Sequence, residues 1–226
     1  ASEISKIENV KIVGIITPTN QDKDPLYQYG IKENLNVMRF SKIKSKEAIN
    51  IFFELKVDLL VMAYVTDIVP LEIINNPSKG TIQYHPSLLP IHRGPSSINW
   101  AIINGDKKTG ITIFWPDEGL DTGPILLQEE VEISDNDTTG SLYFNKLFPI
   151  GVNSIINSIK LVLKNEAPKI KQNENNATYE SWCSTQEIDW NKPANEIYNL
   201  IRGCDPQPGA WTNINSEKVF LYDCKL

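Results

Sequence analysis

The stretch HPSLLPIHRGPSSINWAIINGDKKTGITIFWPDEGLDTG, residues 85–123, decides the fold and holds both histidines of the chain. The apolar run TIQY precedes His85, and the run ITIFWPDEGL precedes Asp121. Both runs predict strands, so each polar side chain follows a strand where a loop begins. Open α/β sheets keep their ligand sites in such a crevice, outside the ends of the strands. The stretch therefore predicts a functional site at one edge of a sheet.

Strand and helix patterns alternate on both sides of this stretch. Apolar, β-branched runs predict strands at 10–17, 57–63, 80–84, 110–115 and 124–133. Helical spacing predicts helices at 45–56, 71–74, 97–104 and 138–164, the last interrupted near Pro149. Ser45 can cap the first of these helices, whose apolar face carries Ile49, Phe52 and Phe53. This alternation is typical of an α/β fold with a doubly wound, mainly parallel sheet.

The composition changes after the longest predicted helix. Residues 169–177, KIKQNENNA, are polar enough to predict a linker, so we expect one domain over 1–176. We expect residues 177–226 to form this linker and the beginning of a small, incomplete, β-rich C-terminal domain. Its predicted helix, turn and strand lie at 194–201, 204–211 and 218–222.

The beginning of the chain also departs from a complete sheet. Its first residues, ASEISKIEN, resemble the end of a helix rather than a first strand. We expect that the first βα unit is missing. Loss of a central strand exposes sheet edges, so we expect this chain to be poorly stable alone.

Charge and composition exclude several classes of function. The chain has 226 residues, 41% of them apolar, and a net charge of −6, which favours a small-molecule substrate over nucleic acid. No apolar run approaches the roughly 20 residues of a membrane span. The three cysteines are widely spaced and complete no zinc site, so we expect reduced thiols, no metal and a cytoplasmic location.

The loop after His85 can hold that side chain in place. Pro86 and Pro90 restrict its backbone, and Gly94 permits conformations that other residues resist. His85 can exchange a proton near neutral pH, and Asp121 can stabilise its charged form, which suits acyl transfer. Spacing alone favours another interpretation, in which His85 is a satisfied polar residue at a strand end and Asp121 a turn former. The absence of GxSxG argues against a serine nucleophile.

Residues 85–133 resemble the core of the formyltransferase family that uses 10-formyltetrahydrofolate. This family includes methionyl-tRNA formyltransferase, glycinamide ribonucleotide formyltransferase and the N-terminal part of 10-formyltetrahydrofolate dehydrogenase. The likeness extends from VKIVGIIT to PGAWT and is nearest to the dehydrogenase-like branch, through YHPSLLP, SINW and LIRGCDPQPGAW. It implies a Rossmann-like formyltransferase fold.

The resemblance implies a catalytic set of an Asn, a His two residues later and an Asp. His85 and Asp121 match this set, whereas Gln83 stands at the Asn position, which the dehydrogenase-like branch also changes. Gln83 can donate its amide to a developing oxyanion, unless it is only a strand residue pointing into the layer. The implied mechanism places His85 and Gln83 at the oxyanion, with Asp121 moving the proton. It requires no metal.

The resemblance also implies where the folate binds. The pterin ring is expected between the loop after the strand VDLLVMA and the loop before Asp121, which together contribute Tyr64, Val65, Thr66, Ile68, Asp117, Glu118, Gly119 and Leu120. The alternatives are ordinary core packing for the apolar members and a solvated turn for the acidic ones. His92 and Arg93 are expected either to face a substrate anion or to be solvated.

Three functions remain open from the sequence. The first is transfer of a formyl group from 10-formyltetrahydrofolate to an amine, for which methionyl-tRNA is the common acceptor in the family. The loop QDKDPLYQ, residues 21–28, is short and mixed in charge, which disfavours tRNA. The second is a hydrolase that releases formate, or the formyl-donating module of a dehydrogenase. The third is a sugar-nucleotide formyltransferase or a noncatalytic folate binder. The oligomeric state is not predicted.

Overall fold

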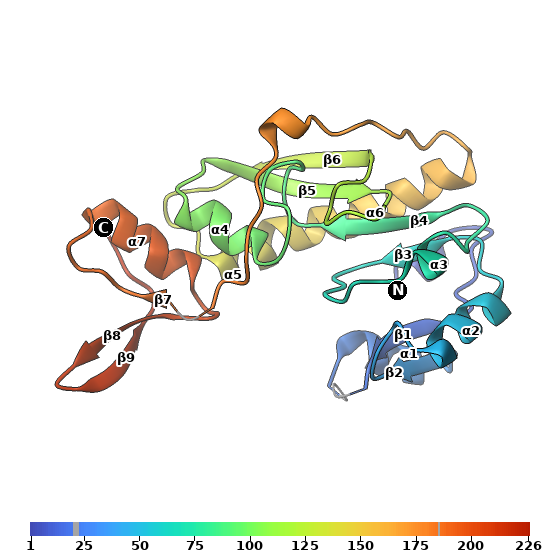
Figure 1. Cartoon of the computed structure of the whole chain (residues 1–226), viewed down its shortest axis with the longest axis horizontal. Helices are drawn as coiled ribbons and strands as arrows, with labels where there is room; N and C mark the ends of the chain where they lie inside the picture. Colours follow the sequence, from blue (N-terminus) through green and yellow to red (C-terminus); the bar gives the residue numbers. More distant parts are fainter. Residues whose placement is uncertain (20–22, 185) are drawn as a thin grey trace.

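Three separate sheets are formed by the residues that the computed structural model describes, 1–19, 23–184 and 186–226. Their strand orders are β1-β2, β3-β4-β5-β6 and β7-β8-β9 (Figure 1). The strands are β1 Ile15–Pro18, β2 Val37–Phe40, β3 Leu60–Met62, β4 Thr81–His85, β5 Lys108–Phe114, β6 Ile125–Glu132, β7 Gln186–Glu187, β8 Ala210–Ile214 and β9 Glu217–Leu221. The α-helices are α1 Pro25–Lys32, α2 Lys46–Leu55, α3 Leu71–Ile74, α4 Ser97–Ile103, α5 Thr139–Leu142, α6 Phe148–Leu163 and α7 Ala194–Gly203. Short 3-10 helices η1 and η3 span Ile4–Lys6 and Glu174–Asn176, and the π-helix η2 spans Tyr143–Leu147.

The α/β class is confirmed, with an antiparallel part that the alternation of elements did not predict. β1 pairs with β2 and β3 pairs with β4 in parallel, whereas β5 runs antiparallel to both β4 and β6. Among the described residues, β1 and β3 share no ladder, so the two N-terminal sheets are not continuous. Strand β4 is thus an interior strand of its sheet, flanked by β3 and β5.

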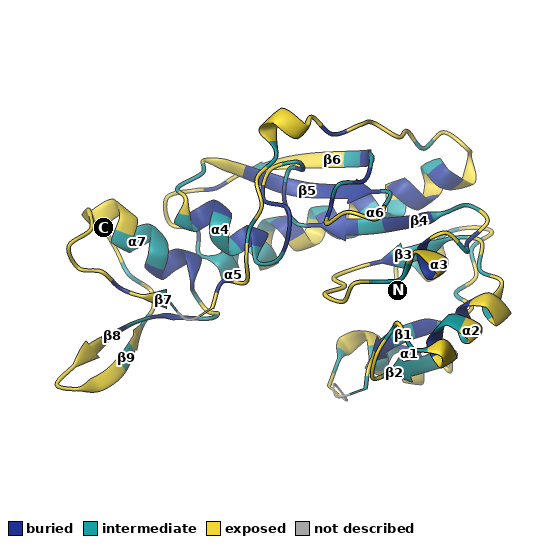
Figure 2. Ribbon diagram, in the orientation of Figure 1, coloured by how far each residue is buried: buried dark blue, intermediate teal, exposed yellow. Residues whose placement is uncertain are grey.

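The core lies between the β4–β5–β6 sheet and α6. Strand β5 is buried over almost its whole length, and α6 packs along β5 and β6 (Figure 2). A Cβ at Gly151 of α6 would come within 2.7 Å of the Tyr84 ring, so the glycine permits this close approach. Tyr84 therefore points to the α6 face of β4.

The predicted interruption of the long helix is real. The π-helix η2 separates α5 from α6 directly before Pro149. The 25-residue stretch Thr139–Leu163 is long and apolar enough to cross a membrane. Buried core helices of water-soluble proteins can have the same length and composition. Here its α6 part packs against the sheet.

Local sequence signals near the N-terminus are partly confirmed. The Ser45 side chain accepts a hydrogen bond from the Ala48 backbone N–H and caps α2, as predicted. Phe52 of the predicted apolar face is buried, together with Ala48. The prediction is wrong at Phe53, which is 50% exposed because it lies outside the face that the helix turns inward. The loop QDKDPLYQ is shorter than predicted, since its residues from Pro25 onward begin α1. Residues 21 and 22 of this loop lie outside the described residues.

The polar segment after α6 follows the surface of the sheet domain rather than leaving it. We call residues 168–184 the strap; it is drawn in orange in Figure 1, where it runs back above β6 and passes α4. Ile170 forms an isolated antiparallel bridge with Ile125, the first residue of β6. Beyond the strap, α7 packs against α4, and the β7–β8–β9 sheet lies in the same C-terminal unit.

Candidate active site

Strand β4 presents two polar side chains on one face. Successive side chains of a strand alternate between faces, so Gln83 and His85 lie opposite the buried Tyr84. Met62 pairs with Gln83, and the loop that follows β3 therefore leaves the sheet at the same edge as His85. The Gln83 amide is half-buried and makes no hydrogen bond to any residue that the structure describes. It is thus free to donate to a ligand.

The loop after His85 is pinned to β5 by hydrogen bonds. The Thr112 hydroxyl donates to the Ser87 carbonyl at 2.7 Å and accepts from the Leu89 backbone N–H at 3.1 Å. The Ser87 hydroxyl donates to the Ile91 carbonyl at 2.6 Å. These bonds give the loop a fixed shape without occupying His85.

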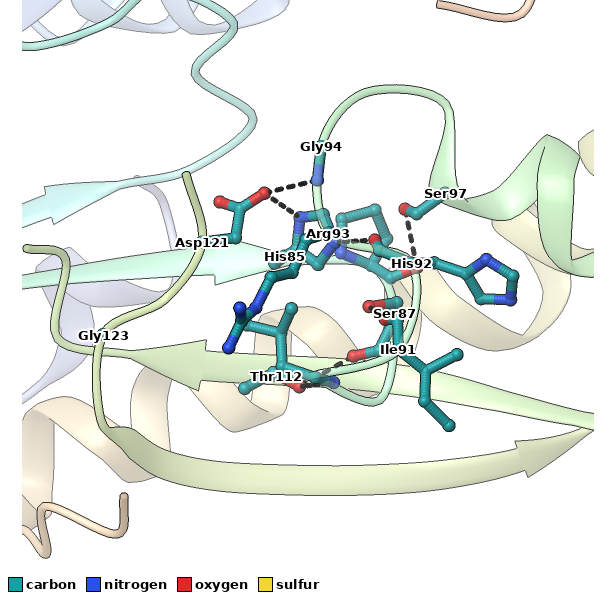
Figure 3. Close-up of polar contacts among 12 residues, drawn as sticks. His85, Ser87, Ile91, His92, Arg93, Gly94, Ser97, Thr112, Asp121 and Gly123 are labelled. Carbon is teal, nitrogen blue, oxygen red and sulfur yellow. Dashed lines mark hydrogen bonds and ion pairs between the residues drawn. The ribbon is translucent and has the colours of Figure 1, made fainter. Parts of the chain in front are cut away.

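His85 and Asp121 meet in a buried pair (Figure 3). The Nδ1 atom of His85 lies 3.5 Å from Oδ2 of Asp121, and both side chains are 8% exposed. The same Oδ2 accepts a hydrogen bond from the Gly94 backbone N–H at 2.8 Å. Asp121 has a positive φ of 55°, a left-handed conformation that Asp tolerates better than most residues. The backbone therefore aims this carboxylate at the imidazole.

The hydrogen bond made by Nε2 of His85 determines which of its two ring nitrogens carries the proton. Nε2 of His85 lies 2.8 Å from the His92 carbonyl oxygen, which can only accept a hydrogen bond, so Nε2 carries the proton. Burial lowers the pKa of His85, and the charge of Asp121 opposes that shift. Neutral His85 therefore turns an unprotonated Nδ1 toward Asp121. An imidazole in this state can accept a proton from a reacting group.

The expectation for His92 and Arg93 is wrong. Arg93 is 0% exposed, and its guanidinium donates to Gln172, Glu174 and Tyr179. The His92 ring is also buried, between two carboxylates of the protein. Neither side chain faces a substrate anion or solvent, because the strap covers this side of the loop.

The residue that sequence reasoning missed is Gln172 of the strap. Its Nε2 donates to the backbone carbonyls of Asp121 and Gly123 at 2.9 and 2.7 Å, while its Oε1 accepts from Arg93. A single buried amide thus fixes the backbone of the Asp121 loop. Gln172 lies in a stretch of uniformly polar residues, and composition carries no signal that separates it from its neighbours.

The eight residues expected at the pterin lie on two exposed loops. Tyr64 has a positive φ and packs its ring 5.8 Å from that of Tyr143, and Ile68 is 89% exposed, so core packing is excluded for Ile68. In the second loop, Oδ1 of Asp117 accepts from the Gly119 N–H and the Thr122 hydroxyl, which closes the turn before Asp121. The other members, Val65, Thr66, Glu118 and Leu120, are exposed as well.

No group of three or more His, Cys, Asp or Glu side chains among the described residues could hold a metal ion. The three cysteines are free thiols. Cys183 and Cys204 lie with their sulfur atoms 4.0 Å apart, where the strap meets the end of α7.

Comparisons with known proteins identify relatives over most of the chain. Two family models match the chain, one described as formyl transferase over residues 3–149 and one described as formyl transferase, C-terminal domain, over residues 184–226. Methionyl-tRNA formyltransferase of Acetivibrio thermocellus is 36% identical over 225 residues, which cover 95% of this chain and 72% of that protein. The mitochondrial 10-formyltetrahydrofolate dehydrogenase of Homo sapiens is 41% identical over 228 residues, which cover 97% of this chain.

The chain spans 25% of the length of that dehydrogenase. Among solved structures, HypX from Aquifex aeolicus in complex with tetrahydrofolic acid has a TM-score of 0.67 at 18% identity, over 92% of this chain and 37% of the HypX chain. That likeness concerns the fold alone. The matched models and the methionyl-tRNA formyltransferase relative establish that this chain belongs to the formyl transferase family.

Proposed function

We propose that this chain moves the formyl group of 10-formyltetrahydrofolate to an amine, with His85, Asp121 and Gln83 around the reacting carbonyl. The observation that carries the proposal is the buried His85–Asp121 pair at the sheet edge where the Gln83 amide has no partner among the described residues. The exposed loops 64–68 and 117–120 would hold the pterin ring. The names of the relatives, which include a formyltransferase and a formyltetrahydrofolate dehydrogenase, support this donor.

The proposed mechanism needs only side chains of this site. The amine attacks the formyl carbon, and the Gln83 amide donates to the oxygen that becomes negative. Nδ1 of His85 accepts the proton that the amine loses, and Asp121 stabilises the resulting imidazolium. The bond from the formyl carbon to N10 then breaks, and the proton passes to N10, directly or through water. The formyl carbon has exchanged one nitrogen for another, with no net oxidation.

Hydrolysis is the second candidate, with water in place of the amine and formate as the product. Two observations favour it: the identity to a formyltetrahydrofolate dehydrogenase is high, and the net charge of −6 offers no general attraction to tRNA. A sugar nucleotide remains a third acceptor. The cytoplasmic location and the domain boundary at residue 176 stay predictions.

Product analysis separates these candidates. The protein is incubated with 10-formyltetrahydrofolate alone, with methionyl initiator tRNA and with an amino-sugar nucleotide, while tetrahydrofolate, formate and formylated product are quantified. Formate without any acceptor identifies the hydrolase, and acceptor-dependent tetrahydrofolate identifies the transferase. Folate binding without any product identifies a noncatalytic binder and contradicts the proposal.

Asp121→Asn tests the catalytic assignment. Asn tolerates the positive φ of this position and its side-chain oxygen can still accept from Gly94, so the change removes mainly the charge. We expect turnover to fall by about 10²- to 10⁴-fold while folate binding is retained. The matched control is Asp135→Asn, an exposed carboxylate paired with Lys107, which should leave turnover unchanged. Undiminished turnover in Asp121→Asn would exclude the assigned role.

A further inference from the structure

The His92 ring bridges two carboxylates on separate parts of the chain. Nδ1 lies 2.7 Å from Oε1 of Glu180 in the strap, and Nε2 lies 2.7 Å from Oδ2 of Asp106 in the turn after α4. The ring is buried, with the residue 5% exposed. Carboxylate oxygens accept hydrogen bonds, so both ring nitrogens must donate, and a doubly protonated imidazole carries a positive charge. We call His92, Asp106 and Glu180 the His92 clamp.

The backbone of His92 reaches the catalytic pair. Its carbonyl oxygen accepts from Nε2 of His85, and its N–H donates to the Thr178 hydroxyl of the strap at 2.8 Å. His92 has a φ of 56°, a conformation that a histidine adopts rarely and that must be held by its surroundings. Figure 3 shows the His92 ring pointing away from the His85–Asp121 pair. The contact between the clamp and His85 is therefore made by this carbonyl.

We propose that His92 is a positioning residue, whose charged ring, held between Asp106 and Glu180, keeps its own carbonyl against Nε2 of His85 and so directs Nδ1 of His85 toward Asp121. This inference rests on the proposed function of the His85–Asp121 pair. If the carbonyl moved away, the neutral His85 ring could carry its proton on Nδ1 instead. That tautomer could no longer accept a proton from the attacking group at the position facing Asp121.

The charges around the two imidazoles are consistent with a positioning role for His92 and a proton-accepting role for His85. Asp106 and Glu180 face the His92 ring from the α4 turn and from the strap, whereas the Arg93 guanidinium points to Gln172 and Glu174. Burial is the main cause that lowers the pKa of His85, and the charge of His92 lowers it further. A charged His92 thus favours a neutral, proton-accepting His85.

The chain contains two histidines, so the ring states can be measured directly. In nitrogen-15 NMR spectra, the two ring nitrogens of a neutral imidazole have well-separated shifts, whereas those of an imidazolium have similar shifts. His85→Gln and His92→Gln assign the two signals. At neutral pH we expect His92 to be doubly protonated and His85 to carry one proton, on Nε2.

Glu180→Gln is the decisive variant, because it removes the negative charge beside His92 while its amide oxygen can still accept from the ring, so we expect it to fold. We expect a larger share of His85 with the proton on Nδ1, and the same change, more complete, in His92→Gln. In both variants kcat should fall by about tenfold to a hundredfold, with little change in KM. The control is Asp135→Asn, which removes the charge of an exposed carboxylate outside this loop and should leave the His85 spectrum unchanged.

The outcomes separate this inference from the proposed function. A singly protonated His92, or an unaltered His85 tautomer and kcat in folded Glu180→Gln, would overturn the inference. An inactive parent protein with both rings in the expected states, and with the expected tautomer change in Glu180→Gln, would refute the proposed function while supporting the clamp. If His92→Gln does not fold, Glu180→Gln decides alone.

Discussion

At His85, burial and a nearby charge act on one pKa in opposite directions, and burial prevails. In the unfolded chain a histidine takes up its proton near pH 6.5, whereas folded His85 does so only at a lower pH. Below about pH 6.5 the unfolded state therefore binds more protons, and the free energy of unfolding falls as the pH decreases. Above that pH this contribution is fully present.

Urea unfolding between about pH 8 and pH 5 measures this effect. We expect the unfolding midpoint of the parent protein to decrease across the acidic half of that range, and to decrease less in His85→Gln. Equal pH dependence in the two proteins would show that His85 is not buried as a neutral ring.

Gly123 is a position where no side chain fits. A Cβ there would lie 1.8 Å from the Trp115 carbonyl oxygen, which belongs to backbone and cannot rotate away. A Cβ at Gly119 would instead meet the Thr122 hydroxyl, at the end of a side chain that can turn. We expect Gly123→Ala to lower the free energy of unfolding by about 1–3 kcal/mol, and Gly119→Ala to cost less. Urea midpoints in the reverse order would contradict this account.

The residues of the site differ in how far the sequence reveals them. His85 and Asp121 follow predicted strands, so their meeting at one sheet edge could be expected. His92 and Arg93 also lie in a polar loop, but their burial depends on the strap, about 80 residues later in the chain. Loop sequence carries no information about such distant partners, which explains why their predicted role was wrong.

The strap is the element whose composition misleads most. Residues 169–177 are polar, as linkers are, yet Gln172 is buried and supplies hydrogen bonds to the Asp121 loop and to Arg93. The polarity arises because the partners of this element are backbone carbonyls and a guanidinium rather than apolar side chains. Helix α2 is the opposite case, since its cap and spacing act within the helix and could be predicted.

Gln172→Leu tests whether the strap holds the site. Leucine fills a similar volume but leaves the carbonyls of Asp121 and Gly123 and part of Arg93 without buried partners. Because each unsatisfied buried group costs about 1–3 kcal/mol, we expect the free energy of unfolding to fall by about 3 kcal/mol. Asn175→Ala, at an exposed position of the same strap, should change it by less than about 0.5 kcal/mol. A similar small effect for both variants would mean that the strap is a passive connection.

At the scale of the molecule, the site lies where three parts of the chain meet. Strand β4 supplies His85, the β5–β6 connection supplies Asp121, and the strap closes over both before reaching the C-terminal unit. Asn99 of α4 donates to the carbonyls of Gly203 and Gln207, which ties that unit to the helix following the His85 loop. These long-range contacts could not be predicted from local sequence patterns. The β1–β2 sheet takes no part in them.

The separate β1–β2 sheet should unfold before the rest. A two-stranded sheet is marginally stable, and β1 shares no ladder with β3 among the described residues. All five tryptophans lie at or beyond Trp100, so their fluorescence reports the β5–β6 region and the C-terminal unit, whereas far-ultraviolet circular dichroism reports every element. We expect circular dichroism to lose part of its signal at a lower urea concentration than fluorescence.

Amide hydrogens of 15–18 and 37–40 should exchange faster than those of β4 and β5, because local opening exposes them without global unfolding. Coincident curves and uniform protection would show instead that side-chain packing alone couples the two sheets into one cooperative unit.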